Sequence, residues 1–144
     1  MAALRRHSDK TDLLKQVPLF ANLSPKQLTE VARHTDEIKK EAGSVLAEQG
    51  DLGNEMFIIV SGSATITRDG QKLASRGDGD FVGEMSLLDG QPRSATVTVE
   101  EDSVLLVMHR SDFSQLLDDV PGLARKILQG LSQRLRETDA MLLD

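Results

Sequence analysis

Residues 45–109 consist of short runs rich in valine, isoleucine, threonine and leucine, separated by glycine and aspartate. Such runs are typical of β-strands, and the intervening residues are typical of turns. The dipeptide Asp69-Gly70 predicts a two-residue hairpin, because both residues tolerate the backbone angles of tight hairpin turns. Many short, evenly spaced strands indicate a small antiparallel barrel or jelly roll. The predicted strands lie near residues 45–48, 57–61, 64–68, 72–75, 95–99 and 104–108.

A helical region, residues 13–40, is predicted before the strands. Ser24 can cap a helix, Pro25 suits its first position, and Gln27 stands three residues after the cap. The apolar residues that follow have helical spacing and predict a one-faced helix that ends near Thr35. Residues 1–12 are polar, so they are predicted to be a frayed terminus or a short helix that continues into the next residues.

Helices are also predicted after the strands, in residues 111–144. Asp112 is expected to cap a short helix, and Pro121 is expected to open a longer one that runs to the C-terminus. The longer helix carries a four-three spacing that is typical of a heptad seam. Two interpretations stay open: the helix lies on its own barrel, or it pairs with a second copy in a homodimer. The seam positions are Ala124, Leu128, Leu131, Leu135, Thr138 and Leu142.

The size and charge of the chain limit its class. With 144 residues it has room for about one domain, predicted over residues 13–144 after the polar segment 1–12. Its 17 basic and 23 acidic residues give a net charge of −6, which would repel a nucleic acid, so no nucleic-acid partner is expected for this chain alone. It has neither an apolar run long enough to span a membrane nor a secretory signal, so a cytoplasmic location is expected.

The residue types needed for catalysis or metal binding are sparse. There is no cysteine, and the three histidines, His7, His34 and His109, have no ligand spacing. No nucleophile, base and orienting group can be recognised together. We therefore expect no catalytic residue, no metal site, no cofactor and no enzymatic activity.

Residues 80–97 form the segment whose chemistry is most specific. Gly83 permits close approach of a ligand to the backbone, and the helical turn that follows presents free N–H groups to an anion. The guanidinium of Arg93 suits two phosphate oxygens. The carboxylate of Glu84 would repel a phosphate unless it accepts from a ribose hydroxyl or pairs with Arg93. A sugar phosphate satisfies both signs of charge, and a buried Glu84–Arg93 ion pair that closes the barrel is the alternative.

This segment resembles the phosphate-binding cassette of the cyclic nucleotide-binding domain family, which has roughly the pattern Phe-Gly-Glu-x-Ala-Leu-Leu, a loop, then Arg-x-Ala-Thr-Val. Here the two parts are residues 82–88 and 93–97, and Val82 and Ser86 depart from the pattern. The likeness, to members of the bacterial catabolite activator and protein kinase A regulatory type, extends over nearly the whole chain. It implies a mainly β fold: an antiparallel β-roll at 44–109, containing the cassette 80–97, flanked by N-terminal and C-terminal helices.

The resemblance also implies a ligand site. Glu84 would accept from the ribose 2′-hydroxyl, while Arg93 and Ser94, with the backbone N–H groups of Ser86 and Ala95, would hold the cyclic phosphate. The implied set around the ribose and phosphate is Gly83, Glu84, Met85, Ser86, Arg93, Ser94 and Ala95. The implied contacts with the base are Ala64 and Leu73 from the roll and Arg134 and Thr138 from the last helix.

The function implied by the resemblance is that of a regulatory sensor that binds a cyclic nucleotide and signals through movement of the C-terminal helix. At Ser94 the chain resembles the bacterial cAMP receptors, so cAMP is expected to be favoured over cGMP. Two alternatives remain open: a degenerate domain that acts by protein contact, and the sensor part of a transcription regulator.

Overall fold

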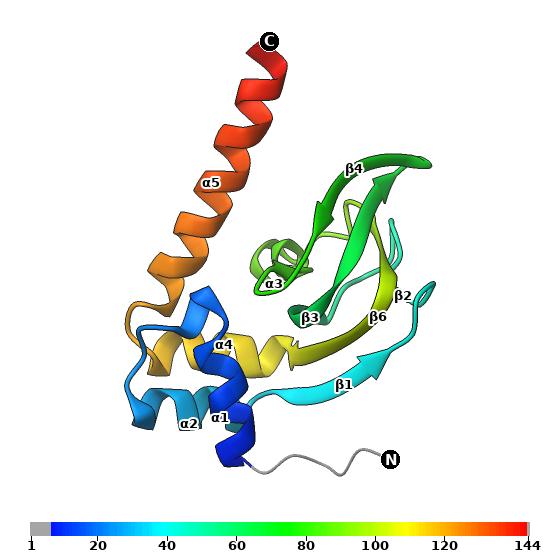
Figure 1. The fold of residues 1–144 in the computed structure, drawn as a ribbon. Helices are drawn as coiled ribbons and strands as arrows, with labels where there is room; N and C mark the ends of the chain where they lie inside the picture. The colour runs from blue at the N-terminus through cyan, green and yellow to red at the C-terminus, as the bar shows by residue number, and fades with distance from the viewer. Residues whose placement is uncertain (1–6, 144) are drawn as a thin grey trace.

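The computed structural model describes residues 7–143 as a curled antiparallel sheet with helices at one end (Figure 1). Its elements in chain order are α1 (His7–Lys15), a 3-10 helix η1 (Pro18–Phe20), α2 (Pro25–Arg33), β1 (Asp36–Lys40), β2 (Val45–Ala47), β3 (Glu55–Arg68), β4 (Gln71–Arg76), β5 (Phe81–Val82), α3 (Glu84–Asp89), β6 (Thr96–His109), α4 (Arg110–Asp119) and α5 (Leu123–Leu143). The predicted antiparallel β-roll with helices before and after it is confirmed.

Two long strands, β3 and β6, form the centre of the sheet. The order is β1-β6-β3-β4, with β2 also paired to β6 and β5 to β3, and every pairing is antiparallel. In Figure 1, α1, α2 and α4 gather at one end of the roll, while α3 lies between the roll and α5. This arrangement places the segment 80–97 next to the C-terminal helix.

The prediction of six short strands was wrong in dividing each of two long strands into two short ones. The predicted strands 57–61 and 64–68 are one strand, β3, and those at 95–99 and 104–108 are one strand, β6. Gly62, at φ +124°, lies among register shifts between Ile59 and Ala64, so it bends β3 and does not end it. The hairpin at Asp69-Gly70 is confirmed, since Arg68 pairs directly with Gln71.

The helical region 13–40 was predicted too long. Residues 36–40 form strand β1, paired with β6 from Asp36↔Val107 to Lys40↔Ser103, because the edge of β6 satisfies their backbone groups. The capping box of Ser24 and Gln27 is present at the start of α2. Of the two alternatives for the first residues, the structure has a helix from His7, and residues 1–6 lie outside the described part.

Two predicted helix starts also differ. His109 occupies the N-cap of α4, while Asp112 lies in the first turn and contacts Nδ1 of His34 at 2.7 Å. Asp112 does not cap the helix, and its contact with His34 joins α4 to the residue that ends α2. Pro121 and Gly122 form a turn, and α5 begins at Leu123.

The C-terminal helix is anchored by its first turns. Leu123 and Ile127 are 1% and 3% exposed and pack in the apolar core formed by the helices and one face of the sheet. Leu128 and Leu135 are 61% and 62% exposed, whereas Leu131 packs partly against the core. The later turns of α5 stand clear of the helices at the end of the roll (Figure 1). Both interpretations of the heptad seam therefore stay open.

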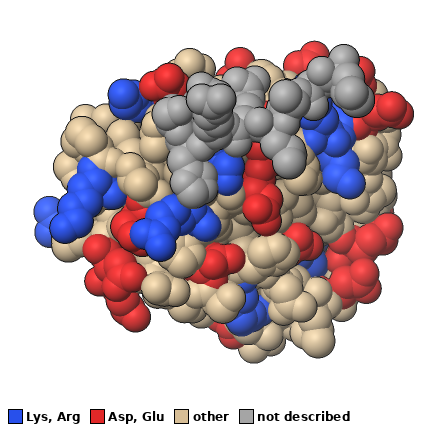
Figure 2. Space-filling model, turned by 90° about the horizontal axis from the view of Figure 1, so that it is seen from below, with Lys and Arg blue, Asp and Glu red and all other residues tan. Residues whose placement is uncertain are grey.

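The surface carries charges of both signs. On the face in Figure 2, blue Lys and Arg side chains are interspersed with red Asp and Glu side chains. On α2, Nη1 of Arg33 lies 3.1 Å from Oε1 of Glu30. In the described part of the chain, no helix has the length and apolarity needed to cross a membrane.

Gly62 and Gly70 offer a test of the bend in β3. A Cβ at Gly62 would lie 2.5 Å from the Cβ of Ser103, whereas a Cβ at Gly70 would meet open space among the described residues. Both have positive φ, so Gly70→Ala should cost about 1 kcal/mol of unfolding free energy from the backbone alone. Gly62→Ala should cost about 2 kcal/mol or more, since it adds a clash. Urea unfolding measures both, and equal losses would contradict the close approach at Gly62.

Candidate phosphate and nucleotide site

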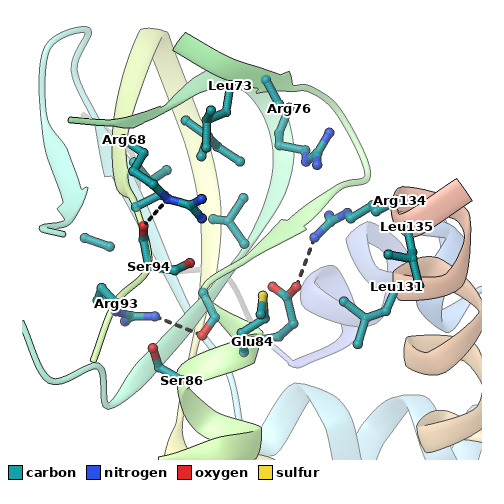
Figure 3. A pocket seen from close by; sticks show the side chains of 18 residues that line it. Arg68, Leu73, Arg76, Glu84, Ser86, Arg93, Ser94, Leu131, Arg134 and Leu135 are labelled. Atoms are coloured by element: carbon teal, nitrogen blue, oxygen red, sulfur yellow. Dashed lines mark hydrogen bonds and ion pairs between the residues drawn. The ribbon is translucent and has the colours of Figure 1, made fainter. Parts of the chain in front are cut away.

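A cavity of about 510 Å³ lies between the roll, α3 and α5 (Figure 3). It brings together nine of the eleven residues expected to contact a ligand. The nine are Gly83, Glu84, Met85, Ser86, Arg93, Ser94, Ala95, Leu73 and Arg134. Thr138 lies on α5, but its side chain is outside the described part.

Gly83 sets the direction of α3. It occupies the N-cap in the left-handed region, with φ 87°. A Cβ there would lie 2.7 Å from Nη1 of Arg93 and 3.0 Å from the carbonyl oxygen of Glu55. Only glycine therefore fits, and the turn begins α3 at Glu84, so that the first residues of this helix line the cavity.

The side chain of Arg93 is held in place by backbone carbonyl oxygens. It is 8% exposed, and its guanidinium donates to the carbonyl oxygens of Gly83 at 2.8 Å and Glu55 at 2.6 Å. A Cβ at Gly53 would lie 2.2 Å from its Nε, so that loop also needs glycine. Burial lowers the pKa of Arg93, and the carboxylates of Glu55 and Glu84 oppose this shift. The guanidinium is thus positioned beside the cavity by backbone oxygens.

Glu84 pairs with α5. Its Oε1 accepts from Nη1 of Arg134 at 3.0 Å, and the glutamate side chain is 4% exposed. Arg134 also donates to the carbonyl oxygen of Phe81, and its guanidinium carbon lies 4.5 Å from the centre of the Phe81 ring. The alternative of a Glu84–Arg93 ion pair that closes the barrel is therefore wrong, because the carboxylate takes its ion-pair partner from α5.

Burial dominates the ionisation of this pair. Removal from water raises the pKa of Glu84, although the positive charges of Arg134, Arg76 and Arg93 lower it in part. Burial also lowers the pKa of Arg134, and Glu84 opposes that shift. The pair is thus costly to desolvate, and removal of either partner would leave a buried charge unpaired.

The base-side expectations need adjustment. Leu73 is 47% exposed and lines the cavity, but Ala64 is 1% exposed and lies within the core of the roll. The larger side chain of Arg76, directly opposite Ala64 in the β3–β4 pairing, lines the cavity in its place.

Sequence reasoning missed two arginines that line the cavity, Arg68 and Arg76. Nε of Arg68 donates to the carbonyl oxygen of Ser94 at 2.8 Å. The alternation of side chains along a strand could have indicated both. Arg68 lies four residues after Ala64 in β3, which predicts that the two face the same side of the sheet, and Arg76 lies opposite Ala64 in the β3–β4 pairing.

Comparison with known proteins places this site in a family. The sequence model described as "Cyclic nucleotide-binding domain" matches residues 37–120. The chain belongs to the cyclic nucleotide-binding domain family. The match covers more than half of the chain and includes the whole segment 80–97, so the predicted cyclic nucleotide-binding regulatory domain is confirmed at the level of the family.

Curated relatives in this family have further parts. The chain is 38% identical over 112 residues to a cyclic nucleotide-gated potassium channel of Mesorhizobium japonicum, covering 78% of this chain and 31% of the channel. It is 35% identical over 134 residues to the cyclic AMP receptor protein of Thermus thermophilus, covering 90% of this chain and 62% of the receptor. The chain thus spans about a third of one relative and less than two thirds of the other.

Solved structures agree with the fold of the family. The catabolite activator protein of Thermus thermophilus superposes with a TM-score of 0.77 at 35% identity, over 87% of this chain and 61% of that one. A cyclic nucleotide-binding domain from Methylobacillus flagellatus superposes with a TM-score of 0.79 at 27% identity, over 95% and 82% of the two chains.

The raised pKa of Glu84 predicts a signed pH dependence. The folded state binds this proton more tightly than the unfolded state, so the group's stabilising contribution is present at low pH and lost as the pH rises through the raised pKa. Between about pH 4 and pH 7 the parent should lose melting temperature relative to Glu84→Gln. Thermal unfolding of both chains without ligand measures the difference. A relative gain by the parent over that range would mean that Arg134 outweighs burial.

Proposed function

We propose that this domain binds a cyclic nucleotide in the cavity, as a regulatory sensor. The observation that carries the proposal is the arrangement of charge: Arg93 and the start of α3 at one end, and the buried carboxylate of Glu84 beside them. A cyclic phosphate suits the donors, and an adjacent ribose hydroxyl suits the carboxylate. A simple anion would satisfy the donors and leave Glu84 opposed to it.

Each part of the ligand then has a partner. The phosphate accepts from Arg93, from the hydroxyl of Ser94 and from the N–H groups of Ser86 and Ala95. The ribose 2′-hydroxyl donates to the carboxylate of Glu84 beside the bond that Oε1 of Glu84 accepts from Arg134. The base extends toward Leu73 and α5 and buries apolar surface there.

The favoured nucleotide is cAMP. The support is the resemblance of Ser94 to the bacterial cAMP receptors and the name of the Thermus relative, a cyclic AMP receptor protein. We expect a modest preference, and competition between labelled cAMP and unlabelled cGMP measures it. A clear preference for cGMP would overturn this part of the proposal.

Loss of Arg93 provides the main test. Arg93→Glu should weaken cAMP binding at least about a hundredfold, because a charge-assisted bond is lost and a repulsive charge is added. Arg93→Lys, which keeps the charge but loses the fork, should bind with intermediate affinity. Calorimetric titration measures both. Arg33→Glu on the exposed side of α2 is the matched control and should bind as the parent does.

An Arg93→Glu chain that melts as a folded domain and binds cAMP like the parent would contradict the proposed site. Failure of the folded parent to bind either cyclic nucleotide would instead favour the degenerate domain that acts by protein contact.

The proposed output is a movement of α5. One helix carries Arg134, which holds Glu84, and the exposed seam of Leu128 and Leu135. A ligand can shift the equilibrium between two positions of this helix only as much as its affinities for the two positions differ. Sensing could thereby control a further domain, as in a transcription regulator, or pairing with a second copy.

Amide exchange tests this output. Binding of cAMP should slow exchange in residues 128–142 and change self-association through Leu131 and Leu135, because the ligand draws α5 toward the cavity. Hydrogen exchange by mass spectrometry, with sedimentation of the same samples, measures both effects. Slowing confined to the roll and residues 80–97 would mean that binding is not relayed through α5.

A further inference from the structure

Arg76 is the last residue of β4, and its side chain lies at the cavity. It faces Ala64 across the β3–β4 pairing, and Ala64 is 1% exposed. A small methyl group beneath it leaves space for the long side chain of Arg76 along the wall of the roll. An arginine can therefore lie there without displacing the core.

The guanidinium of Arg76 is poorly satisfied. Nη1 makes a long hydrogen bond of 3.4 Å to the carbonyl oxygen of its neighbour Ser75, and Nε is buried without a hydrogen-bond partner among the described residues. Arg93, by contrast, donates to two carbonyl oxygens. The weak bond of Nη1 leaves the outer end of the guanidinium poorly satisfied, so its Nη donors can bond to an acceptor that enters the cavity.

Arg76 belongs to the end of the cavity remote from the phosphate donors. In Figure 3 it lies beside Arg134, across the cavity from Arg93. Its charge lowers the pKa of both Glu84 and Arg134, whereas the charges that shift the pKa of Arg93 come from Glu55, Glu84 and Arg110. A ligand whose phosphate lies at Arg93 and whose ribose lies at Glu84 would direct its base toward Arg76.

On the basis of the proposed function, we infer that Arg76 is a specificity-determining residue that reads the base and supports guanine. A guanidinium presents two parallel N–H donors. Guanine offers two acceptors on one edge, N7 and O6, whereas adenine offers N7 and the donor N6. Arg76 thus raises the affinity for cGMP and leaves the preference for cAMP modest.

The variant Arg76→Met tests this role, because it keeps an unbranched side chain and removes the donors. We expect the Kd for cGMP to rise at least about fivefold and the Kd for cAMP to change by less than about twofold. Cyclic inosine monophosphate should follow cGMP, since it keeps N7 and O6. It lacks the 2-amino group of guanine, so this ligand separates recognition of N7 and O6 from recognition of the 2-amino group.

Two further variants act as controls. Arg76→Lys keeps the charge without the fork and should lose affinity for cGMP alone. Arg68→Met removes an arginine that bonds to Ser94 at the phosphate end, so it should weaken both nucleotides by the same factor. Melting curves establish that each variant is folded, and Arg76→Lys carries the test if Arg76→Met is not.

Equal loss of cAMP and cGMP in Arg76→Met would overturn the inference, because Arg76 would then serve the shared ribose phosphate, and the proposed function would stand. Loss of cGMP without loss of cyclic inosine monophosphate would also overturn it, since the 2-amino group would then be the feature that is read. A parent that binds none of the three would overturn the proposed function itself.

Discussion

Arg93 joins parts of the chain that are far apart in sequence, and the geometry of the site depends on it. Its guanidinium donates to the carbonyl oxygens of Gly83 and Glu55, so it holds the start of α3 against the start of β3. Gly53 and Gly83 leave space for it, since a Cβ at either would come within 2.7 Å of the guanidinium. Arg110, the first residue of α4, holds the cassette from a second side by donating to the carbonyl oxygen of Ser86 at 3.0 Å. The cassette is thus bonded both to the sheet and to the helices that lead into α5.

The ion pair of Glu84 and Arg134 connects the segment 80–97 to α5, whose later turns stand clear of the helices at the end of the roll. The first turns of α5 are fixed by Leu123 and Ile127, while Leu128 and Leu135 are exposed. The contacts of Arg134 with Glu84 and Phe81 hold a later turn near the roll. A ribose hydroxyl and Arg134 would share the carboxylate of Glu84, so ligand binding and the position of α5 become linked through one group. Because Glu84 is 3% exposed, loss of Arg134 without a replacement donor would leave a buried carboxylate unpaired.

Much of the fold could be predicted from local patterns. The runs of residues 45–109 indicated an antiparallel roll, Asp69-Gly70 indicated a hairpin, and Ser24 with Gln27 indicated the start of α2. Local patterns could not separate a bend from a strand end at Gly62, because glycine is suited to both. They also missed β1, whose charged residues 36–40 become a strand only because β6 offers them an edge. Residues such as these take their structure from a partner that is distant in sequence.

The candidate site likewise has some features that local sequence determines and others that depend on tertiary structure. The sequence by itself determined the turn at Gly83, the free N–H groups at the start of α3 and the presence of Glu84, Arg93 and Ser94 within one short segment, because backbone geometry and residue chemistry act over a few positions. Only the tertiary structure decided that Glu84 pairs with Arg134, 50 residues away, and not with Arg93. It also decided that Arg76 and not Ala64 lines the cavity, since that depends on the pairing of two strands and on which face of the sheet is hollow. Long-range packing selects the partner of a buried charge among several that the local sequence leaves equivalent.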